Sequence, residues 1–281
     1  MTQSASTYGT IKGALEDPNA PYYTRKYSVF LQGSYGNSTN IWSDSDVDVV
    51  MCLTSVHYYD DARLSADDKE RYRRERITGT YTFNQFRSEV LAWLIQKFGA
   101  GVRAGKKAIF IPGNGNRRDA DVLVCVEHRD YTAYPSAQGA TYYDGVCFWT
   151  ADGVKIVNYP RQHKENCTTK HQNASTRFKP NIRVWKNMRN AMIDRHLLSV
   201  GTAPSYFIEG MLWNVPIECF GSSFQNTFTN ISGWLDRCNP TQLVCANERY
   251  FLLRDGHPVC WNNADYVTFS TAARKFWDNS Q

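Results

Sequence analysis

Two pairs of aspartates stand at the heads of apolar runs, where a strand that enters a protein core does not ordinarily carry charge. The first pair, Asp46 and Asp48, alternates with Val47 and Val49 at the start of the apolar segment 47–53. Residues two apart in a strand project to the same side, so we expect the two carboxylates to lie together while the valines enter the core. Two like charges this close repel each other unless a cation lies between them. Mg²⁺, which prefers oxygen ligands, is the expected cation.

A second acidic pair, Asp119 and Asp121, precedes the apolar run 122–126. If that strand lies beside the first one, one of the two aspartates completes a cluster of three carboxylates. We favour Asp121, because it directly abuts the apolar run as Asp48 does. Three carboxylates can hold two Mg²⁺ ions, or Mn²⁺ in their place, which clamp the attacking and leaving oxygens of a phosphoryl transfer. The alternative is a polar strand edge whose charges prevent pairing with other strands.

Asp44 extends the same row of alternate aspartates. It could be a third metal ligand or a turn residue at the mouth of the strand. We favour the turn, because the apolar run begins only at Val47. The metal ligands expected from the sequence are therefore Asp46, Asp48 and Asp121.

The dipeptide Gly33-Ser34 follows a short apolar segment, 27–32, that is typical of a strand. A glycine after a strand lets backbone amides approach a phosphate closely, and the serine hydroxyl adds a donor. Alone, this dipeptide has no specificity. The order of strand, Gly-Ser, loop, Asp-x-Asp, strand and a later third Asp on a strand is far more specific than any of its parts. The chain contains no G-x-x-x-x-G-K-[ST] sequence, so it is not a P-loop protein.

The hydrophobic pattern predicts a strand-rich first part and a helical second part, an α+β layout with a boundary near residue 160. We expect a catalytic core over residues 1–160 and a helical lobe over 161–281. Strands are expected at 27–32, 47–53, 108–111 and 122–126, with a further hairpin around residues 151–153. Helices are expected at 82–97, with Gly99 as the stop, and at 173–196, 204–214, 224–237 and 262–278. The charge-dense segment 61–76 is expected to be an exposed helix with a solvated face or a mobile insert.

Composition excludes a disordered chain. Of the 281 residues, 42% are hydrophobic and 14% aromatic, and the formal net charge is +5. That charge agrees with an anionic ligand without requiring one. No apolar run approaches the ~18–20 residues of a membrane span, and the N-terminus lacks the apolar core of a signal peptide. We therefore expect a cytoplasmic protein.

The eight cysteines include no C-x-x-C pair, so a zinc ribbon is not expected. Most of them lie in apolar runs, and we interpret them as reduced core residues. His163 and Cys167 are a lone pair of metal-ligating residue types. Two ligands do not make a metal site.

These motifs resemble the nucleotidyltransferase superfamily that includes DNA polymerase beta, whose hallmark is a Gly-Ser, an acidic-x-acidic pair and a third acid. The stretch LQGSYGNSTNIWSDSDVDVVM is closely similar to the bacterial CD-NTases, relatives of cyclic GMP-AMP synthase and oligoadenylate synthase in CBASS-type anti-phage defence. The resemblance covers roughly residues 25–278. It implies a polymerase beta-like lobe, a helical lobe and an active site in the cleft between them. Its catalytic and metal-binding residues would be Asp46, Asp48 and Asp121.

The second half of the chain extends the resemblance. FKPNIRVWKNMRN is similar to the family's helix that presents a lysine to the triphosphate, with Lys186 as the best match. APSYFIEGMLWNVP resembles the family's Pro-Ser-Tyr helix start, which implies that Ser205 contacts phosphate and Tyr206 stacks on a base. The alternatives are a solvated surface lysine at 186, and a half-buried tyrosine at 206 with Ser205 as the helix cap. The implied nucleotide-binding residues are Gln32, Gly33, Ser34, Lys186, Ser205 and Tyr206.

The resemblance implies a Mg²⁺-dependent enzyme that joins ribonucleoside triphosphates, ATP or GTP being expected, into a cyclic di- or trinucleotide and releases pyrophosphate. A separate effector protein would read this second messenger. The chain has little room for a nucleic-acid-sensing insert, so no obligatory nucleic-acid activator is expected. No membrane partner is expected either, because the chain lacks a long apolar run. One alternative is a template-independent RNA-tailing nucleotidyltransferase. Another is a catalytically idle fold that acts as a binding or toxin–antitoxin module, which the complete acidic set argues against.

Overall fold

The chain divides into two units, and the division does not follow the order of the chain. The sheet unit consists of Met1–Gln32 and Ser45–Tyr159, and the helical unit consists of Gly33–Asp44 and Pro160–Gln281. The sequence places a single boundary near residue 160. The structure has a division at that point and also groups a segment from the first part of the chain with the helical unit.

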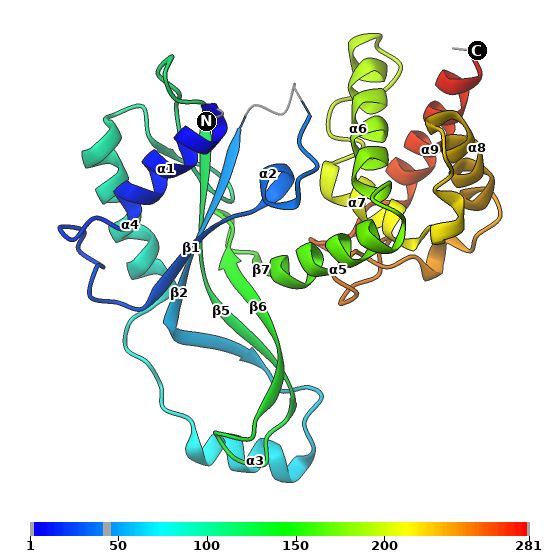
Figure 1. Ribbon diagram of the computed structural model, residues 1–281. Coiled ribbons are helices and arrows are strands. Elements are labelled where there is room, and N and C mark those ends of the chain that lie inside the picture. The colour runs from blue at the N-terminus through cyan, green and yellow to red at the C-terminus, as the bar shows by residue number, and fades with distance from the viewer. Residues whose placement is uncertain (1–2, 42–45, 280–281) are drawn as a thin grey trace. The chain divides into compact units, whose positions relative to one another are not determined.

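A mixed sheet forms the centre of the sheet unit in the computed structural model, which describes residues 3–41 and 46–279 (Figure 1). The strand order is β1-β2-β5-β4-β3, with β6 paired to β5 and β7 to β6. β2 and β5 are parallel, and the other neighbours are antiparallel. The strands are β1 (Tyr27–Leu31), β2 (Val47–Asp60), β3 (Arg103–Ala104), β4 (Ile109–Ile111), β5 (Ala120–Ala133), β6 (Thr141–Trp149) and β7 (Lys155–Asn158). This sheet and the helical second part confirm the predicted α+β class.

Strand β5 pairs with β2 and also with two further strands, β4 and β6, at different points along its length. β4 pairs with its first residues, from Ala120 to Val122, and β6 pairs with its second half, from Val126 to Ala133. β4 and β5 confirm the strands expected at 108–111 and 122–126, and the two strands pair antiparallel. The pairing of β6 with β7 confirms the hairpin expected around residues 151–153.

Helix α4 (Phe83–Phe98) packs on the sheet and confirms the helix expected at 82–97. Thr82 and Gln85 form a capping box at its start, in which each side chain accepts a hydrogen bond from the other residue's backbone amide. Gly99 ends the helix with φ of 88°, a backbone conformation that favours glycine. Local sequence signals thus determine both ends of this helix.

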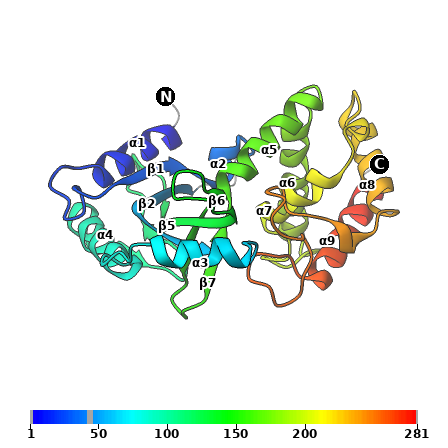
Figure 2. The ribbon, with the colours of Figure 1, turned by 90° about the horizontal axis from the view of Figure 1, so that it is seen from below.

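Helix α1 (Gln3–Leu15) lies beside α4 and packs on the sheet, as the two views in Figures 1 and 2 show. The sequence pattern does not predict this helix. Its buried face carries Ser4 and Thr7 as well as Ile11 and Leu15. Because two polar side chains interrupt the apolar stripe, the helical periodicity of hydrophobic residues is lost.

Beyond their apolar runs, β2 and β5 continue with β6 into a long extension whose end carries helix α3 (Ala66–Glu75) (Figure 1). The segment 61–76 therefore contains a helix, one of the two expected alternatives. Its face is not wholly solvated, because Tyr72 is buried against Tyr131 and Tyr134, with ring centroids 5.0 Å away in both cases. These tyrosines anchor the charged helix to the strands.

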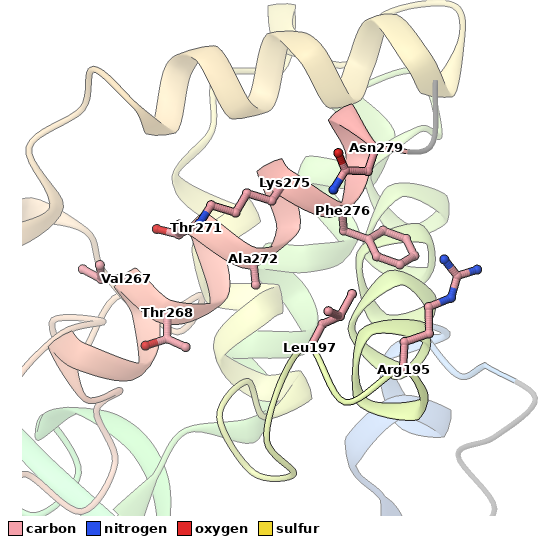
Figure 3. Close-up of a pocket in the computed structure, with 9 residues that line it drawn as sticks. All are labelled: Arg195, Leu197, Val267, Thr268, Thr271, Ala272, Lys275, Phe276 and Asn279. Atoms are coloured by element: carbon pink, nitrogen blue, oxygen red, sulfur yellow. The ribbon is translucent and has the colours of Figure 1, made fainter.

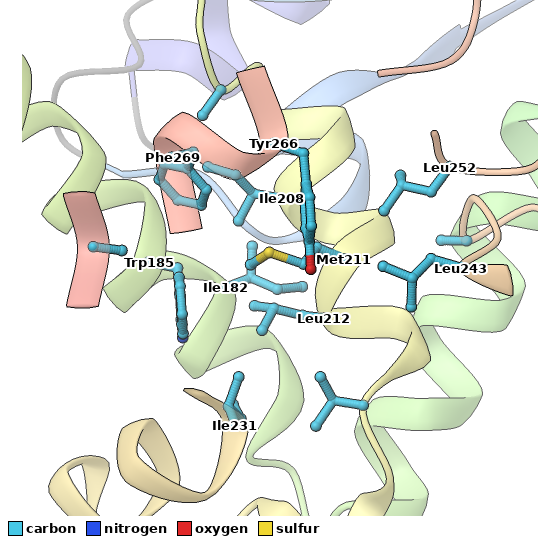
Figure 4. Close-up of a cluster of buried hydrophobic side chains, with 14 of the residues drawn as sticks. Ile182, Trp185, Ile208, Met211, Leu212, Ile231, Leu243, Leu252, Tyr266 and Phe269 are labelled. Atoms are coloured by element: carbon cyan, nitrogen blue, oxygen red, sulfur yellow. The ribbon is translucent and has the colours of Figure 1, made fainter. Parts of the chain in front are cut away.

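Helices pack around a continuous apolar core in the helical unit, part of which is drawn in Figure 4. The ring of Trp185 stacks on Phe228 at 4.9 Å, and Phe228 stacks on Trp277 at 4.2 Å between centroids. The α-helices are α2 (Gly33–Asn37), α5 (Pro160–Asn173), α6 (Phe178–Asp194), α7 (Ser205–Asn214), α8 (Phe224–Leu235) and α9 (Asn263–Asp278). The last three confirm the helices expected at 204–214, 224–237 and 262–278.

The prediction of a single helix at 173–196 is wrong for its first residues, which do not belong to α6. α5 ends at Asn173 and α6 begins at Phe178, and Ser175 and Thr176 between them have φ of 49° and 62°. α5 itself was not expected, because the residues buried on it are His163, Cys167 and Lys170. A helix whose buried face is mostly polar gives no hydrophobic periodicity to read.

All eight cysteines lie in the described part of the chain and are free thiols, five of them buried. The interpretation of most of them as reduced core residues is confirmed. Among the helices of residues 3–41 and 46–279, none is both long and apolar enough to span a bilayer.

The packing of α1 on the sheet predicts a large effect of Ile11→Ala. Ile11 is 0% exposed, so its truncation leaves a cavity that costs about 2–5 kcal/mol in the free energy of unfolding. Ile77→Ala is the matched control, because Ile77 is 95% exposed and its loss should change stability by less than about 0.5 kcal/mol. Urea unfolding of the two variants checks this. Equal effects would contradict the packing of α1.

Candidate active site

Asp48 and Asp121 are direct neighbours on the parallel strands β2 and β5, in register with each other. Across the sheet the same row continues through Phe110 on β4 to Arg103 on β3. Side chains in register on adjacent strands project from the same face. The structure therefore brings these two predicted carboxylates together, and it confirms that the two acid-bearing strands lie side by side.

Asp46 lies one residue before β2 and is exposed. Burial raises the pKa of Asp121, and the neighbouring charges of Asp46 and Asp119 raise it further, while Arg103 lowers it. The predicted acids thus share one electrostatic environment within the sheet unit. Such a concentration of like charge is relieved by a divalent cation with oxygen ligands. Asp44 lies outside the described residues.

Asp119 has a different environment from Asp121. Its carboxylate Oδ1 accepts a hydrogen bond of 2.6 Å from the backbone amide of Gly113, and its carbonyl accepts one of 3.0 Å from the amide of Val47. Asp119 therefore holds the loop between β4 and β5. This agrees with the preference for Asp121 in the acidic set.

Arg103 is a site residue that sequence reasoning missed. Its guanidinium lies 4.1 Å from the ring centroid of Phe110, which stands between Arg103 and Asp121 in the same row. No sequence signal could have found it, because β3 is only two residues long and short polar strands lack a hydrophobic pattern.

The chain leaves the sheet next to Asp48. The backbone amide of Gln32 donates a hydrogen bond of 3.1 Å to the carbonyl of Asp48, and Gly33 follows directly in the chain. Gly33 has φ of 63°, a left-handed conformation that is strained for residues with a Cβ. A glycine is required here because the chain turns sharply from β1 into α2.

Lys186 on α6 is completely buried, 0% exposed. Its Nζ donates hydrogen bonds to the hydroxyl Oγ of Ser34 at 2.8 Å and to the carbonyl of Thr39 at 2.9 Å, all within the helical unit. The alternative of a solvated surface lysine is therefore wrong. The structure brings Ser34 and Lys186, two of the predicted nucleotide-binding residues, into direct contact.

Ser205 and Tyr206 occupy the first turn of α7. Ser205 does not cap the helix, since Pro204 is the N-cap residue, and the Ser205 hydroxyl accepts a hydrogen bond of 3.1 Å from Arg189 Nη1. The ring of Tyr206 stacks on His163 with centroids 5.1 Å apart, and its hydroxyl accepts a hydrogen bond of 3.1 Å from Asn247 Nδ2. One face of the tyrosine ring therefore lies against a histidine of α5.

The carboxylate of Glu209 on α7 is buried, and sequence reasoning did not find it. Its Oε2 lies 2.7 Å from His163 Nε2 and accepts a hydrogen bond of 3.0 Å from Asn37 Nδ2. Its Oε1 accepts a hydrogen bond from the Thr39 hydroxyl. Possible ligand atoms of His163, Cys167 and Glu209 lie within 4.8 Å of one another. The hydrogen-bond donors around Glu209 already satisfy its oxygens without a metal.

Burial alone would lower the pKa of His163, but hydrogen bonding and charge interactions with Cys167 and Glu209 outweigh it and raise the pKa to about 10. For Glu209, burial raises the pKa, but hydrogen bonding and charge interaction with His163 outweigh it and lower the pKa, with Thr39 and Lys186 acting in the same direction. Both pKa shifts favour the charged forms, which makes His163 and Glu209 a candidate buried ion pair.

A groove of about 630 Å³ lies along α9 and is drawn in Figure 3. Leu197, Val267 and Phe276 contribute apolar lining, and the guanidinium of Arg195 lies 5.0 Å from the ring centroid of Phe276. None of the predicted site residues lines this groove. It is not the candidate active site.

Comparison with known proteins decides the family. The cyclic UMP-AMP synthase of Rhodothermus marinus (strain SG0.5JP17-172) is 37% identical to this chain over 248 residues, which is 88% of the chain and 82% of that protein. The chain belongs to the cGAS/DncV-like nucleotidyltransferases, the CD-NTases. The family model for their C-terminal helical domain matches residues 165–278. The family expected from the sequence is confirmed.

Other CD-NTases extend this agreement. The cyclic nucleotide synthase CdnE01 of Staphylococcus haemolyticus is 32% identical over 256 residues, 89% of this chain and 84% of that protein. The solved structure of the Rhodothermus marinus CdnE c-UMP-AMP synthase with Apcpp and Upnpp has a TM-score of 0.88 and 35% identity, covering 99% of this chain and 92% of that one. The chain thus has the CD-NTase fold along its length.

The crowding of carboxylates predicts that Asp121→Asn stabilises the metal-free protein. At neutral pH in EDTA we expect the melting temperature to rise by about 2–4 °C, because the substitution removes one of several like charges. Asp67→Asn, on the exposed surface of α3, is the control and should not raise it. Adding Mg²⁺ should stabilise the wild type more than the variant. A lower melting temperature for Asp121→Asn would contradict the crowding.

The ion pair of His163 and Glu209 predicts a pH dependence of stability. A raised pKa means that the folded chain favours protonated His163, so this stabilisation is complete below about pH 6.5 and is lost as pH rises through about 10. Urea titrations of the wild type and of His163→Gln give the difference between their free energies of unfolding at each pH. This difference should fall between about pH 6.5 and about pH 10. His196→Asn, at an exposed histidine, should show no such trend. A constant difference for His163→Gln would mean that His163 is neutral in the folded chain.

Proposed function

We propose that this chain is a Mg²⁺-dependent nucleotidyltransferase that joins ribonucleoside triphosphates into a cyclic di- or trinucleotide and releases pyrophosphate. The observation that carries the proposal is the in-register pairing of Asp48 with Asp121, with Asp46 one residue before β2. The cyclic nucleotide synthases among its relatives support the same reaction.

We propose that Asp46, Asp48 and Asp121 hold two Mg²⁺ ions, or Mn²⁺ in their place. The donor set fits, because Asp48 and Asp121 lie in register on neighbouring strands and Asp46 lies one residue before β2. Burial raises the pKa of Asp121, and the charge of Asp46 raises it further. When bound, the metal ions neutralise charge on the reacting phosphate and make an acceptor hydroxyl a better nucleophile. The remaining roles belong to residues of this chain.

Phosphate binding is assigned to Gln32, Gly33, Ser34, Lys186 and Ser205. The contact of the Lys186 ammonium with the Ser34 hydroxyl supports this assignment, because it places a positive charge and a hydroxyl together. A triphosphate accepts hydrogen bonds from both kinds of group. Tyr206 would stack a base on the ring face that does not lie against His163.

In the proposed step, a ribose hydroxyl oxygen of the acceptor attacks the α-phosphorus of the donor. An oxygen–phosphorus bond forms, the bond from the α-phosphorus to the oxygen that bridges it to the β-phosphorus breaks, and pyrophosphate leaves with that electron pair. Asp121 is the residue we assign to lie beside that hydroxyl and to take its proton. A second transfer of the same kind closes the ring.

The product would be a second messenger that a separate effector protein reads in CBASS-type anti-phage defence. This part of the proposal rests on the membership of the chain in the CD-NTases. ATP and GTP are the first substrates to test. UTP belongs with them, because the relative from Rhodothermus marinus is named for a product that contains uridine.

One experiment separates the proposed reaction from its alternatives. The purified protein is incubated with the four ribonucleoside triphosphates and Mg²⁺, treated with phosphatase, and its products are identified by mass spectrometry. A phosphatase-resistant cyclic species is the expected result. Extension of added RNA would replace the proposal with a tailing reaction, and absence of any product would point to a catalytically idle fold.

Neutral substitutions test the acidic set. Asp46→Asn and Asp121→Asn should each reduce product formation by about 10²–10³-fold or more, because charge stabilisation of the transferring phosphate is lost. Asp119→Asn is the matched control. It keeps the acceptor for the Gly113 amide and should retain most of the activity. Full activity in Asp121→Asn would show that the metal assignment is wrong.

A further inference from the structure

We propose that Glu209 is a positioning residue for the nucleotide phosphates. Its carboxylate holds the segment Gly33–Thr39 on the helical unit, so that the Ser34 hydroxyl keeps its place against Lys186. The proposal rests on the phosphate-binding role given above to Ser34 and Lys186. It adds a residue that touches no substrate and acts through that segment.

Glu209 and Lys186 hold the segment from two sides. Glu209 accepts hydrogen bonds from the side chains of Asn37, at 3.0 Å, and of Thr39. Lys186 donates to the Ser34 hydroxyl and to the Thr39 carbonyl. Thr39 is 0% exposed, with its side chain bound by the carboxylate and its backbone by the ammonium. Ser34 therefore lies in a stretch of chain that is fixed close to both of its ends.

The carboxylate itself is fixed by the core. Ile208, Met211 and Leu212 of α7 are 0% exposed and belong to the apolar cluster drawn in Figure 4. A helix anchored in this way cannot rotate without disrupting that cluster. Glu209 therefore transmits the rigidity of the helical core to a segment that has only a short helix of its own.

The groups around Glu209 make its burial tolerable. A buried carboxylate is unfavourable unless hydrogen-bonded and paired, and His163 at 2.7 Å provides a partner. Lys186 donates to Ser34 and to Thr39 of the same segment. A phosphate brought to Ser34 would therefore lie beside an ammonium group that can donate to it. The stacking of His163 on Tyr206 also couples the ion pair to the tyrosine we assign to the base.

Measurements of phosphate binding distinguish a positioning role of Glu209 from a role in stability alone. The probe is inorganic tripolyphosphate with Mg²⁺, titrated calorimetrically into wild type, Glu209→Gln and Asn37→Ala. Glu209→Gln should raise Kd about tenfold, the loss expected for charge-assisted hydrogen bonds, and Asn37→Ala should raise it less. The stoichiometry of binding should stay unchanged. Glu165→Gln, which removes an exposed carboxylate from α5, is the matched control and should leave Kd unchanged.

A structural role alone would lower the fraction of binding-competent protein and leave Kd unchanged, and that result would overturn the proposal. Asn37→Ala keeps the test valid if Glu209→Gln does not fold, because it removes one hydrogen bond and no buried charge. The synthesis assay distinguishes the two proposals. Cyclic product from the wild type with unaltered Kd in both variants would overturn only the positioning role. If the variants have a raised Kd and the wild type makes no cyclic product, only the proposed reaction would be overturned.

Discussion

The parallel pairing of β2 with β5 in one register is the constraint on which the candidate site depends. Asp48 and Asp121 stay side by side because separating them would break the hydrogen-bond ladder of two buried strands. A slip by one residue would turn one carboxylate to the opposite face of the sheet. The apolar residues of both strands prevent such a slip, since Val47, Val49 and Val122 are 0% exposed. Hydrophobic packing thereby keeps like charges together.

The sequence was sufficient to predict features that follow from local pattern. Aspartates that alternate with valines could only share a face, and an apolar run after each pair indicated buried strands. The extent of α4 followed from the spacing of its apolar residues, and its end followed from Gly99 as a helix stop. To predict which strands are neighbours, we had to assume that the two apolar runs that follow the acidic pairs lie beside each other. The pairing of β2 with β5 confirms this assumption.

The residues that the sequence could not reveal are those whose burial depends on distant partners. A lysine or glutamate on a helix is ordinarily solvated. Contacts with distant partners, such as those of Lys186 with Ser34 and of Glu209 with Asn37, explain why these two are buried. For the same reason the sequence pattern did not predict α5, whose buried face carries His163 and other polar groups. A buried polar face leaves no periodic hydrophobic signal in the sequence. It can be recognised only when the segments that contact it are known.

Residues 33–41 belong by their contacts to the helical unit, although β1 precedes them and β2 follows them in the chain. The polypeptide therefore passes between the units three times. A fragment cut at residue 160 would lose α2, and Lys186 and Glu209 would lose hydrogen-bonding partners that contribute to making their burial tolerable. The two units are consequently not separable modules. A gene fusion or recombination event that exchanged one of them at the obvious linker would also break the other, so these units are expected to be inherited together.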